Sequence, residues 1–318
     1  MLSTVRRHPR RISLSGLRSF ESALCLFQTS LIKAALEFLS RGVETREVAY
    51  HQCGGAGIRG WCEKILESGF EGLIAEAEAE PTVGWDFSWF DGRATEERPT
   101  WRYVTMLAER ISDTSSVLDI QTGDGLVFAE ALSNALAPEF VAATESWPPN
   151  AGRANATLKP FNCSVSEIAD DSDLPFDDNS FELVVSRHPT VVLWKEICRV
   201  LERGGTYFSQ QVGAGSNREL TDYFMGPQPV ATRRSPETAV ASAEAAGLDI
   251  VDLRRQTLEV KFFDVGAVVY FLRKVLWTVP GFSVLRYRDR LMDMDAEIRR
   301  DGAFISHSER FLIEATKR

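Results

Sequence analysis

The chain has 318 residues, of which 44% are hydrophobic, so it is long enough to bury one large core and an added segment. Its formal net charge of −9 does not attract nucleic acid, and binding to RNA or DNA would need a local basic patch. The five cysteines are scattered and odd in number, which argues against a disulfide framework and indicates reduced thiols. Their spacing does not predict a metal site.

The N-terminal extension, residues 1–60, begins with a basic tail. Residues 1–20 contain five arginines, four serines and no acidic residue, a composition typical of transit peptides. The alternative is a solvated basic tail that leads into an amphipathic accessory helix. We therefore predict a cytoplasmic protein, with a mitochondrial location as the alternative if the tail is a transit peptide.

Residues 61–112 are predicted to form a helical segment with an aromatic loop. The loop reads WDFSWFDGRATEERPTW and carries Trp85, Trp89 and Trp101. Such a cluster of large rings forms either part of an apolar core or a lid over a binding site.

Residues 113–318 alternate between strand and helix patterns, which predicts an α/β domain with a mostly parallel sheet. Trp194, Ile197 and Leu201 lie on one face of a predicted helix that Gly204 ends. Ser235 is expected to cap the next helix, with Pro236 at its first position. The expected strands are Ser116–Ile120, Phe140–Thr144, Phe161–Val165, Phe181–Ser186, Thr206–Val212, Asp249–Leu258 and Arg310–Ala315.

An insertion is predicted at 262–305, between the last two expected strands. Its first part contains the aromatic run VVYFLRKVLWTVPGF, and a charged helix follows. An insertion of this size is expected to cap or wall a pocket, with Tyr270, Phe271 and Trp277 as substrate contacts or core residues. Charged residues interrupt the stretch 262–282, so no membrane-spanning helix is expected there.

The most informative motif is VLDIQTGDG at residues 117–125. Its apolar residues suit a buried strand, and Gly123 and Gly125 predict a turn whose backbone a ligand can approach closely. Phe140–Thr144 is the next strand, and Glu145 at its end could bind the two hydroxyls of a ribose. A strand, a glycine turn and a helix N-terminus predict a site for a nucleotide-like cofactor. The apolar face of that helix is expected to be Leu126, Ala129, Leu132 and Leu136.

Two further blocks, DDSDLPFDDNSFELVVSRH (170–188) and EICRVLERGGTYFSQQVG (196–213), follow the glycine turn in order. With VLDIQTGDG they resemble the class I S-adenosylmethionine-dependent methyltransferases, in the branch called methyltransferase type 11. Other segments, including the aromatic loop and 262–284, resemble a less-characterised subgroup of that branch. The resemblance implies a Rossmann-like fold: a mostly parallel seven-stranded sheet with helices on both faces.

The resemblance also implies roles for individual residues. Glu145 would hold the ribose hydroxyls of S-adenosylmethionine, and Asp170 would lie near its adenine amino group. Arg187 and His188, just past the fourth strand of the motif region, would face the methyl-transfer site. The implied cofactor-binding residues are Asp119, Gln121, Gly123, Gly125, Glu145 and Asp170.

Two residues depart from the pattern of the family. Gln121 stands where the family usually has glycine, so its side chain either crowds the cofactor or points away. Pro189 stands where the subgroup tends to have an acidic residue. For His188, a role as general base or substrate contact competes with a structural role in hydrogen bonding to the backbone.

We therefore expect a methyltransferase that acts on a small molecule, with S-adenosylmethionine as cofactor and no metal. A non-catalytic S-adenosylmethionine-binding protein with a degenerate fold is one alternative, and Gln121 and Pro189 motivate it. An RNA methyltransferase is another, against which the acidic charge argues. A nicotinamide-dependent oxidoreductase is a third, but the turn does not read G-x-G-x-x-G.

Overall fold

The computed structural model describes residues 69–83 and 87–318. Apart from Gly69 and residues 299–302, these residues belong to one compact unit, formed by 70–298 and 303–318. The predicted extension 1–60 and Trp85 lie outside the described residues.

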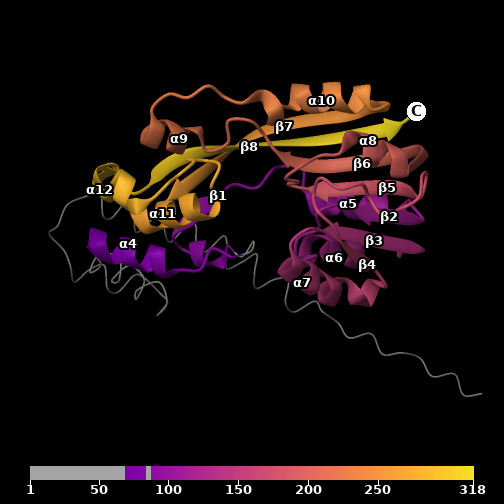
Figure 1. Ribbon diagram of the computed structural model, residues 1–318, viewed down its shortest axis with the longest axis horizontal. Coiled ribbons are helices and arrows are strands. Elements are labelled where there is room, and N and C mark those ends of the chain that lie inside the picture. The colour runs from indigo at the N-terminus through magenta and orange to yellow at the C-terminus, as the bar shows by residue number, and fades with distance from the viewer. Residues whose placement is uncertain (1–68, 84–86) are drawn as a thin grey trace, which may run out of the picture. The chain divides into compact units, whose positions relative to one another are not determined.

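One sheet of eight strands organises this unit, in the order β1-β7-β8-β6-β5-β2-β3-β4 (Figure 1). Strands β2 to β6 pair with one another in parallel, whereas β8 is antiparallel to both β6 and β7, and β1 is antiparallel to β7. The strands are β1 (Ala94–Glu96), β2 (Ser116–Asp119), β3 (Phe140–Glu145), β4 (Ser164–Glu167), β5 (Phe181–Arg187), β6 (Leu201–Val212), β7 (Leu248–Phe262) and β8 (Phe304–Lys317).

The helices connect these strands on both faces of the sheet. They are α4 (Phe70–Ala79), α5 (Tyr103–Ser112), α6 (Leu126–Ser133), α7 (Pro148–Leu158), α8 (Trp194–Val200), α9 (Arg218–Met225), α10 (Pro236–Ala245), α11 (Val265–Lys274) and α12 (Val284–Asp301), with 3-10 turns η1 (Ser88–Phe90), η2 (Lys159–Phe161) and η3 (Thr232–Arg234). No helix among the described residues is long and apolar enough to cross a membrane.

Neighbouring residues of each central strand enter different cores, because side chains alternate between the faces of a sheet. On β2, Val117 packs with α5, α6 and α7, whereas Leu118 packs on the opposite face with α8 and α10. Val185 and Val184 of β5 divide in the same way. Both faces are therefore buried, which is why these strands read as continuous apolar runs.

A further apolar cluster, here called the second core, lies where β7 and β8 extend past the parallel strands (Figure 1). It joins residues of α4, α9, α11 and α12 to Val260 and Phe262 of β7. Tyr270 of α11 is almost fully buried in it and packs against Trp89 and Phe90 of η1. The insertion 262–305 thus folds mainly as α11 and α12.

The structure corrects the predicted strand number, because the sheet has eight strands rather than seven. The additional strand is the short β1, in which Ala94 pairs with Phe262 at the extended end of β7. A third expected strand, Phe161–Val165, begins later, at Ser164, because Lys159–Phe161 forms a 3-10 turn. The mostly parallel α/β class is confirmed.

Two helix predictions are wrong in detail. Helix α8 ends at Val200 rather than near Gly204, because Leu201 already pairs with Phe181 of β5 as the first residue of β6. Helix α6 buries Phe128, Ala131 and Leu132, so the predicted face is only partly correct: Leu132 is buried and Ala129 is half-buried. It stops at Ser133, so Leu136 lies beyond it, and Leu126 at its start is 61% exposed.

The predicted cap of α10 is confirmed: Ser235 Oγ accepts from Thr238 N at 3.1 Å.

Candidate functional site

The predicted site residues end or follow β2, β3, β4 and β5, which are neighbours in the parallel part of the sheet. Because parallel strands point the same way, the residues after them gather at one edge, where ligands of open α/β sheets bind. We call this region the carboxyl edge and define it by residues 119–125, 145–147, 168–172 and 186–191.

The glycine turn between β2 and α6 uses its two glycines differently. Gly125 begins α6 with φ +78°, and a Cβ there would lie 3.0 Å from Leu158 Cγ, so its absence lets α7 pack closely. Gly123 has φ +67°, and a Cβ there would meet nothing within 4 Å. Gly125 therefore serves helix packing, whereas Gly123 exposes its backbone to open space.

Glu145 ends β3 and turns back toward this glycine turn. Its Oε2 accepts the backbone N–H of Gly123 at 2.8 Å, and its Oε1 accepts that of Trp147 at 3.1 Å. Burial raises the pKa of the carboxyl group, and the two backbone N–H groups partly oppose this. Each oxygen keeps a further lone-pair direction, so the carboxylate can still accept hydrogen bonds from a ligand.

Asp119, the last residue of β2, is buried behind the turn. Burial raises the pKa of its carboxyl group to about 7, and the charge of Glu145 adds to this while that of Arg187 opposes it. A buried carboxyl group that titrates near neutrality, beside a candidate binding site, is typical of functional positions.

Gln121 joins the glycine turn to the loop after β5. Its Nε2 donates to Val191 O at 2.7 Å, and its Oε1 accepts Thr190 N–H, also at 2.7 Å. The Thr190 hydroxyl group in turn donates to Asp170 Oδ2 at 2.5 Å. We call this set, Gln121, Thr190, Val191 and Asp170, the glutamine clasp. Gln121 adopts φ 58°, a left-handed conformation that is strained for a residue with a side chain.

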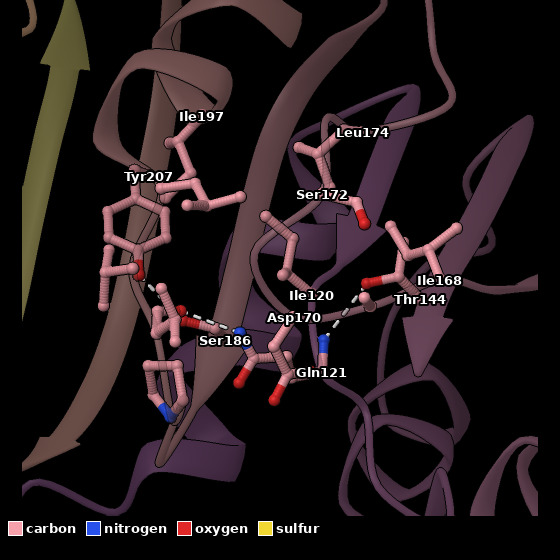
Figure 2. A pocket seen from close by; sticks show the side chains of 15 residues that line it. Ile120, Gln121, Thr144, Ile168, Asp170, Ser172, Leu174, Ser186, Ile197 and Tyr207 are labelled. Atoms are coloured by element: carbon pink, nitrogen blue, oxygen red, sulfur yellow. Dashed lines mark hydrogen bonds between the residues drawn. The ribbon is translucent and has the colours of Figure 1, made fainter. Parts of the chain in front are cut away.

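A pocket lies beside the glutamine clasp and contains about 390 Å³ of space between protein atoms, part of it open to solvent. Figure 2 shows Gln121 and Asp170 close together at this pocket, with Ile168 and Thr144 on one side and Tyr207 on the other. The lining residues are Ile120, Gln121, Thr144, Ile168, Ala169, Asp170, Ser172, Leu174, Ser186, Pro189, Val191, Val192, Leu193, Ile197 and Tyr207.

His188 lies at the end of β5 and is held by a side chain of β6. Its Nε2 is 2.9 Å from Gln210 Nε2, and its backbone N–H donates to Gln210 O at 2.7 Å. Gln210 Oε1 also accepts the indole N–H of Trp101 at 2.7 Å. Burial and the charges of Arg187 and Arg310 hold the pKa of His188 well below its usual range.

A cluster of hydroxyl side chains lies at the same strand ends. Ser186 Oγ lies 2.8 Å from the Tyr207 hydroxyl group and 2.9 Å from Ser209 Oγ. Tyr103 donates to Ser186 O at 3.2 Å, and its ring stacks on Phe208 with the centroids 5.2 Å apart. These bonds hold the end of β5 in place just before Arg187 and His188.

Sequence reasoning missed several of these residues. The clasp partner Thr190 gave no signal, and Gln210 could have been found only as a polar residue within an otherwise buried strand, in the block QQVG. Trp101 was noted as part of an aromatic cluster, but the structure separates the cluster. Trp101 reaches Gln210, whereas Trp89 packs in the second core, and no pocket-lining residue comes from 262–305.

The assignment of the insertion as a cap, with residues such as Tyr270 as its wall, stays a prediction. In the part of the chain that the structure describes, no group of three or more histidine, cysteine or acidic side chains is placed to hold a metal ion.

Comparison with known proteins finds a family model that matches part of the chain. Residues 118–209 match the family described as "Methyltransferase domain", type 11. A search of curated proteins found no match. Solved structures similar to the chain include three bacterial proteins. The first is a functionally unknown protein from Deinococcus radiodurans R1, with 18% identity and a TM-score of 0.50 over 71% of this chain and 91% of that one. The second is YcgJ from Bacillus subtilis, with 17% identity and a TM-score of 0.49 over 69% of this chain and 99% of that one. The third is a putative methyltransferase from Bacillus halodurans C-125, with 16% identity and a TM-score of 0.47 over 67% of this chain and 98% of that one. The first shares the fold.

Proposed function

We propose, from the premise that residues 118–209 form a class I methyltransferase domain, that this chain transfers a methyl group from S-adenosylmethionine to a small-molecule acceptor. One observation carries the proposal: the buried carboxylate of Glu145 lies against the open backbone turn at Gly123. A carboxylate next to exposed backbone is suited to bind a ribose diol whose neighbouring groups run along the turn.

The residues at the carboxyl edge fit this cofactor. The open space over Gly123 leaves room for a ligand to contact the backbone, and both oxygens of Glu145 can accept further hydrogen bonds. Asp170, with Ile168 and Ser172, lines the neighbouring pocket and would hold the adenine. When bound, the cofactor supplies a methyl group on a positively charged sulfur.

The protein's own part in such a transfer is alignment and exclusion of water. Glu145 and the glycine turn would fix the cofactor from one side. The glutamine clasp holds residues 190–191 next to β2, on the other side. Bringing two reactants together in a fixed geometry supplies a large part of the acceleration in such displacements. A general base is needed only where the acceptor must lose a proton.

A non-catalytic binding protein is the second candidate, and the glutamine clasp favours it. The Gln121 side chain spans the gap between β2 and the loop after β5, where the family usually has glycine. Methyl transfer from labelled S-adenosylmethionine to any acceptor in a metabolite extract would reject this candidate.

The acceptor class and location are further parts of the proposal. The net charge of −9 supports a small molecule rather than RNA. We propose a cytoplasmic location. Mitochondria are the alternative, because residues 1–20 are rich in arginine and serine and contain no acidic residue, as transit peptides do. Fusion of residues 1–60 to a fluorescent reporter tests the alternative.

Calorimetric titration with S-adenosylhomocysteine tests the cofactor site. Glu145→Ala is expected to lose roughly 1–3 kcal/mol of binding free energy, since it removes charged hydrogen bonds to the ribose. The matched control is Glu139→Ala, an exposed acidic residue directly before β3, whose loss should leave the affinity unchanged. Equal affinity in wild type and Glu145→Ala would reject the assignment.

Glu145 also anchors the backbone of Gly123 and Trp147, so loss of the turn could mimic loss of a ligand contact. Glu145→Gln retains an oxygen acceptor for one of these N–H groups. It should therefore fold like wild type by circular dichroism and still bind more weakly, because it lacks the charge.

A further inference from the structure

The bonding of Gln210 determines which nitrogen of His188 carries the proton. The indole N–H of Trp101 can only donate, so the group that faces it at 2.7 Å must be the Gln210 oxygen. The amide nitrogen of Gln210 then faces His188 Nε2 at 2.9 Å, and an amide NH₂ can only donate. His188 Nε2 is therefore the acceptor, and the ring proton lies on Nδ1.

The surroundings of His188 keep the ring neutral. Burial lowers its pKa, and so do the positive charges of Arg187, on its own strand, and Arg310, on β8. Arg310 pairs with Glu96 of β1 at 2.5 Å, so the carboxylate of Glu96 is already held in an ion pair with Arg310. A proton added to Nε2 would also face the amide hydrogens of Gln210. His188 has no free lone pair at Nε2 and already carries a proton at Nδ1, so it cannot accept a proton from a substrate.

Arg187 adds a second donor, and its charge is close enough to lower the pKa of this imidazole. Its guanidinium group is exposed and forms no hydrogen bond or ion pair within the part of the chain that the structure describes. The carboxyl group of Asp119 is buried and its pKa is about 7, so near neutral pH it is only partly ionised and offsets only part of this charge. In a chain with a net charge of −9, the end of β5 is thus a local concentration of donors and positive charge.

We propose that the Arg187 guanidinium group and the Nδ1–H of His188 form a subsite for an oxyanion of the methyl acceptor. The acceptor is then a small molecule that carries a carboxylate or a phosphate, since a planar guanidinium group matches both. His188 binds this group as a neutral donor and is not a general base. The inference rests on the proposed function and adds the substrate class to it.

Nuclear magnetic resonance of ¹⁵N-labelled histidine tests the state of His188. The wild-type ring should show the neutral Nδ1–H pattern and keep it from pH 8 to pH 5.5. Gln210→Glu should reverse this, because a carboxylate accepts from Nε2–H and favours the charged ring. A wild-type Nε2–H pattern, or titration near the ordinary pKa of about 6.5, would overturn the inference.

Binding of model anions tests the subsite itself. The probes are benzoate and phenyl phosphate, with benzyl alcohol as the uncharged probe, and the readout is the His188 Nδ1 signal during titration. Arg187→Ala should weaken the better anion at least tenfold, and Arg187→Lys should weaken it less. The matched control is Arg203→Ala, an exposed arginine near the opposite end of β6, which should change nothing.

The pattern of affinities identifies the oxyanion, since the preferred probe carries either the carboxylate or the phosphate. Equal affinity in wild type and Arg187→Ala, or binding of benzyl alcohol as tight as that of the anions, would overturn the proposal. The same samples are titrated with S-adenosylhomocysteine. If the wild-type protein does not bind S-adenosylhomocysteine, the proposed function is rejected. If it does bind, but Arg187→Ala leaves the anion affinities unchanged, only the acceptor subsite is rejected.

Discussion

The second core and the carboxyl edge differ in whether their arginine side chains are paired with acids. In the second core, the buried Arg93 pairs with Glu76 at 2.7 Å and lies 3.5 Å from Asp264, which also caps α11 by accepting from Ala267 N at 2.8 Å. At the carboxyl edge, the exposed Arg187 has no partner within the described residues. The buried carboxyl group of Asp119, at the same edge, has its pKa raised to about 7.

The backbone shows the same contrast. Gln121 and His188, both at the carboxyl edge, adopt φ near +55°, a conformation that side chains disfavour. No residue with a side chain has a positive φ in α4, α11 or α12 of the second core. Strain and unpaired charge persist where the surrounding structure holds them, and they often mark functional sites. We therefore expect the second core to serve stability, and we propose that the carboxyl edge serves binding.

The largest effect is expected from opening the second core. Phe262 is 1% exposed and packs edge-on against Phe271, so Phe262→Ala should lower the free energy of unfolding by about 3–5 kcal/mol. Urea unfolding measures this. Val251→Ala, 62% exposed on the same strand, should change it by less than about 0.5 kcal/mol. If Phe262→Ala lowers the free energy of unfolding as little as this control does, the second core does not have the stabilising role expected of it.

A pH-dependent effect is expected from Asp119. Its pKa is raised from 3.8 to about 7, so the folded protein binds this proton more tightly than the unfolded chain does. The resulting stability is complete below pH 3.8 and is lost as the pH rises through 7, by up to about 4 kcal/mol.

Asp119→Asn should therefore lack this component of the pH dependence, and its stability relative to wild type should rise between pH 4 and pH 8. Chemical unfolding across this range measures the difference. The exposed Asp113→Asn serves as control and should run parallel to wild type. If Asp119→Asn also runs parallel, Asp119 ionises as an ordinary surface acid and the contrast between the regions weakens.

The smallest effect is local and concerns the glutamine clasp. Gln121→Ala removes the acceptor of the Thr190 N–H, so this amide should exchange with solvent roughly tenfold faster, as expected for loss of about one hydrogen bond. The amide of His188 donates instead to Gln210 O and should keep its rate, which gives an internal control. Unchanged exchange at Thr190 would show that the loop is held without Gln121.

Much of this protein was accessible from the sequence because the signals are local. Buried strands read as apolar runs, the turn at Gly123 and Gly125 follows one of them directly, and Ser235 caps its helix three residues before its partner. The position of Glu145 near the glycine turn follows from parallel pairing of successive strands. These features depend on periodicity and on neighbours in the chain.

Tertiary structure alone decided which polar side chains meet. Trp101 and Gln210 are 109 residues apart, and Gln121 and Thr190 are 69 apart, so no local pattern marks either bond. The same holds for the pairing of β1 with the far end of β7. A polar side chain can bond to many partners, and only the packing of the sheet and its helices selects one. For that reason the sequence determined the fold class and the edge at which we propose that ligands bind, whereas tertiary contacts determined which side chains His188 and Gln121 meet.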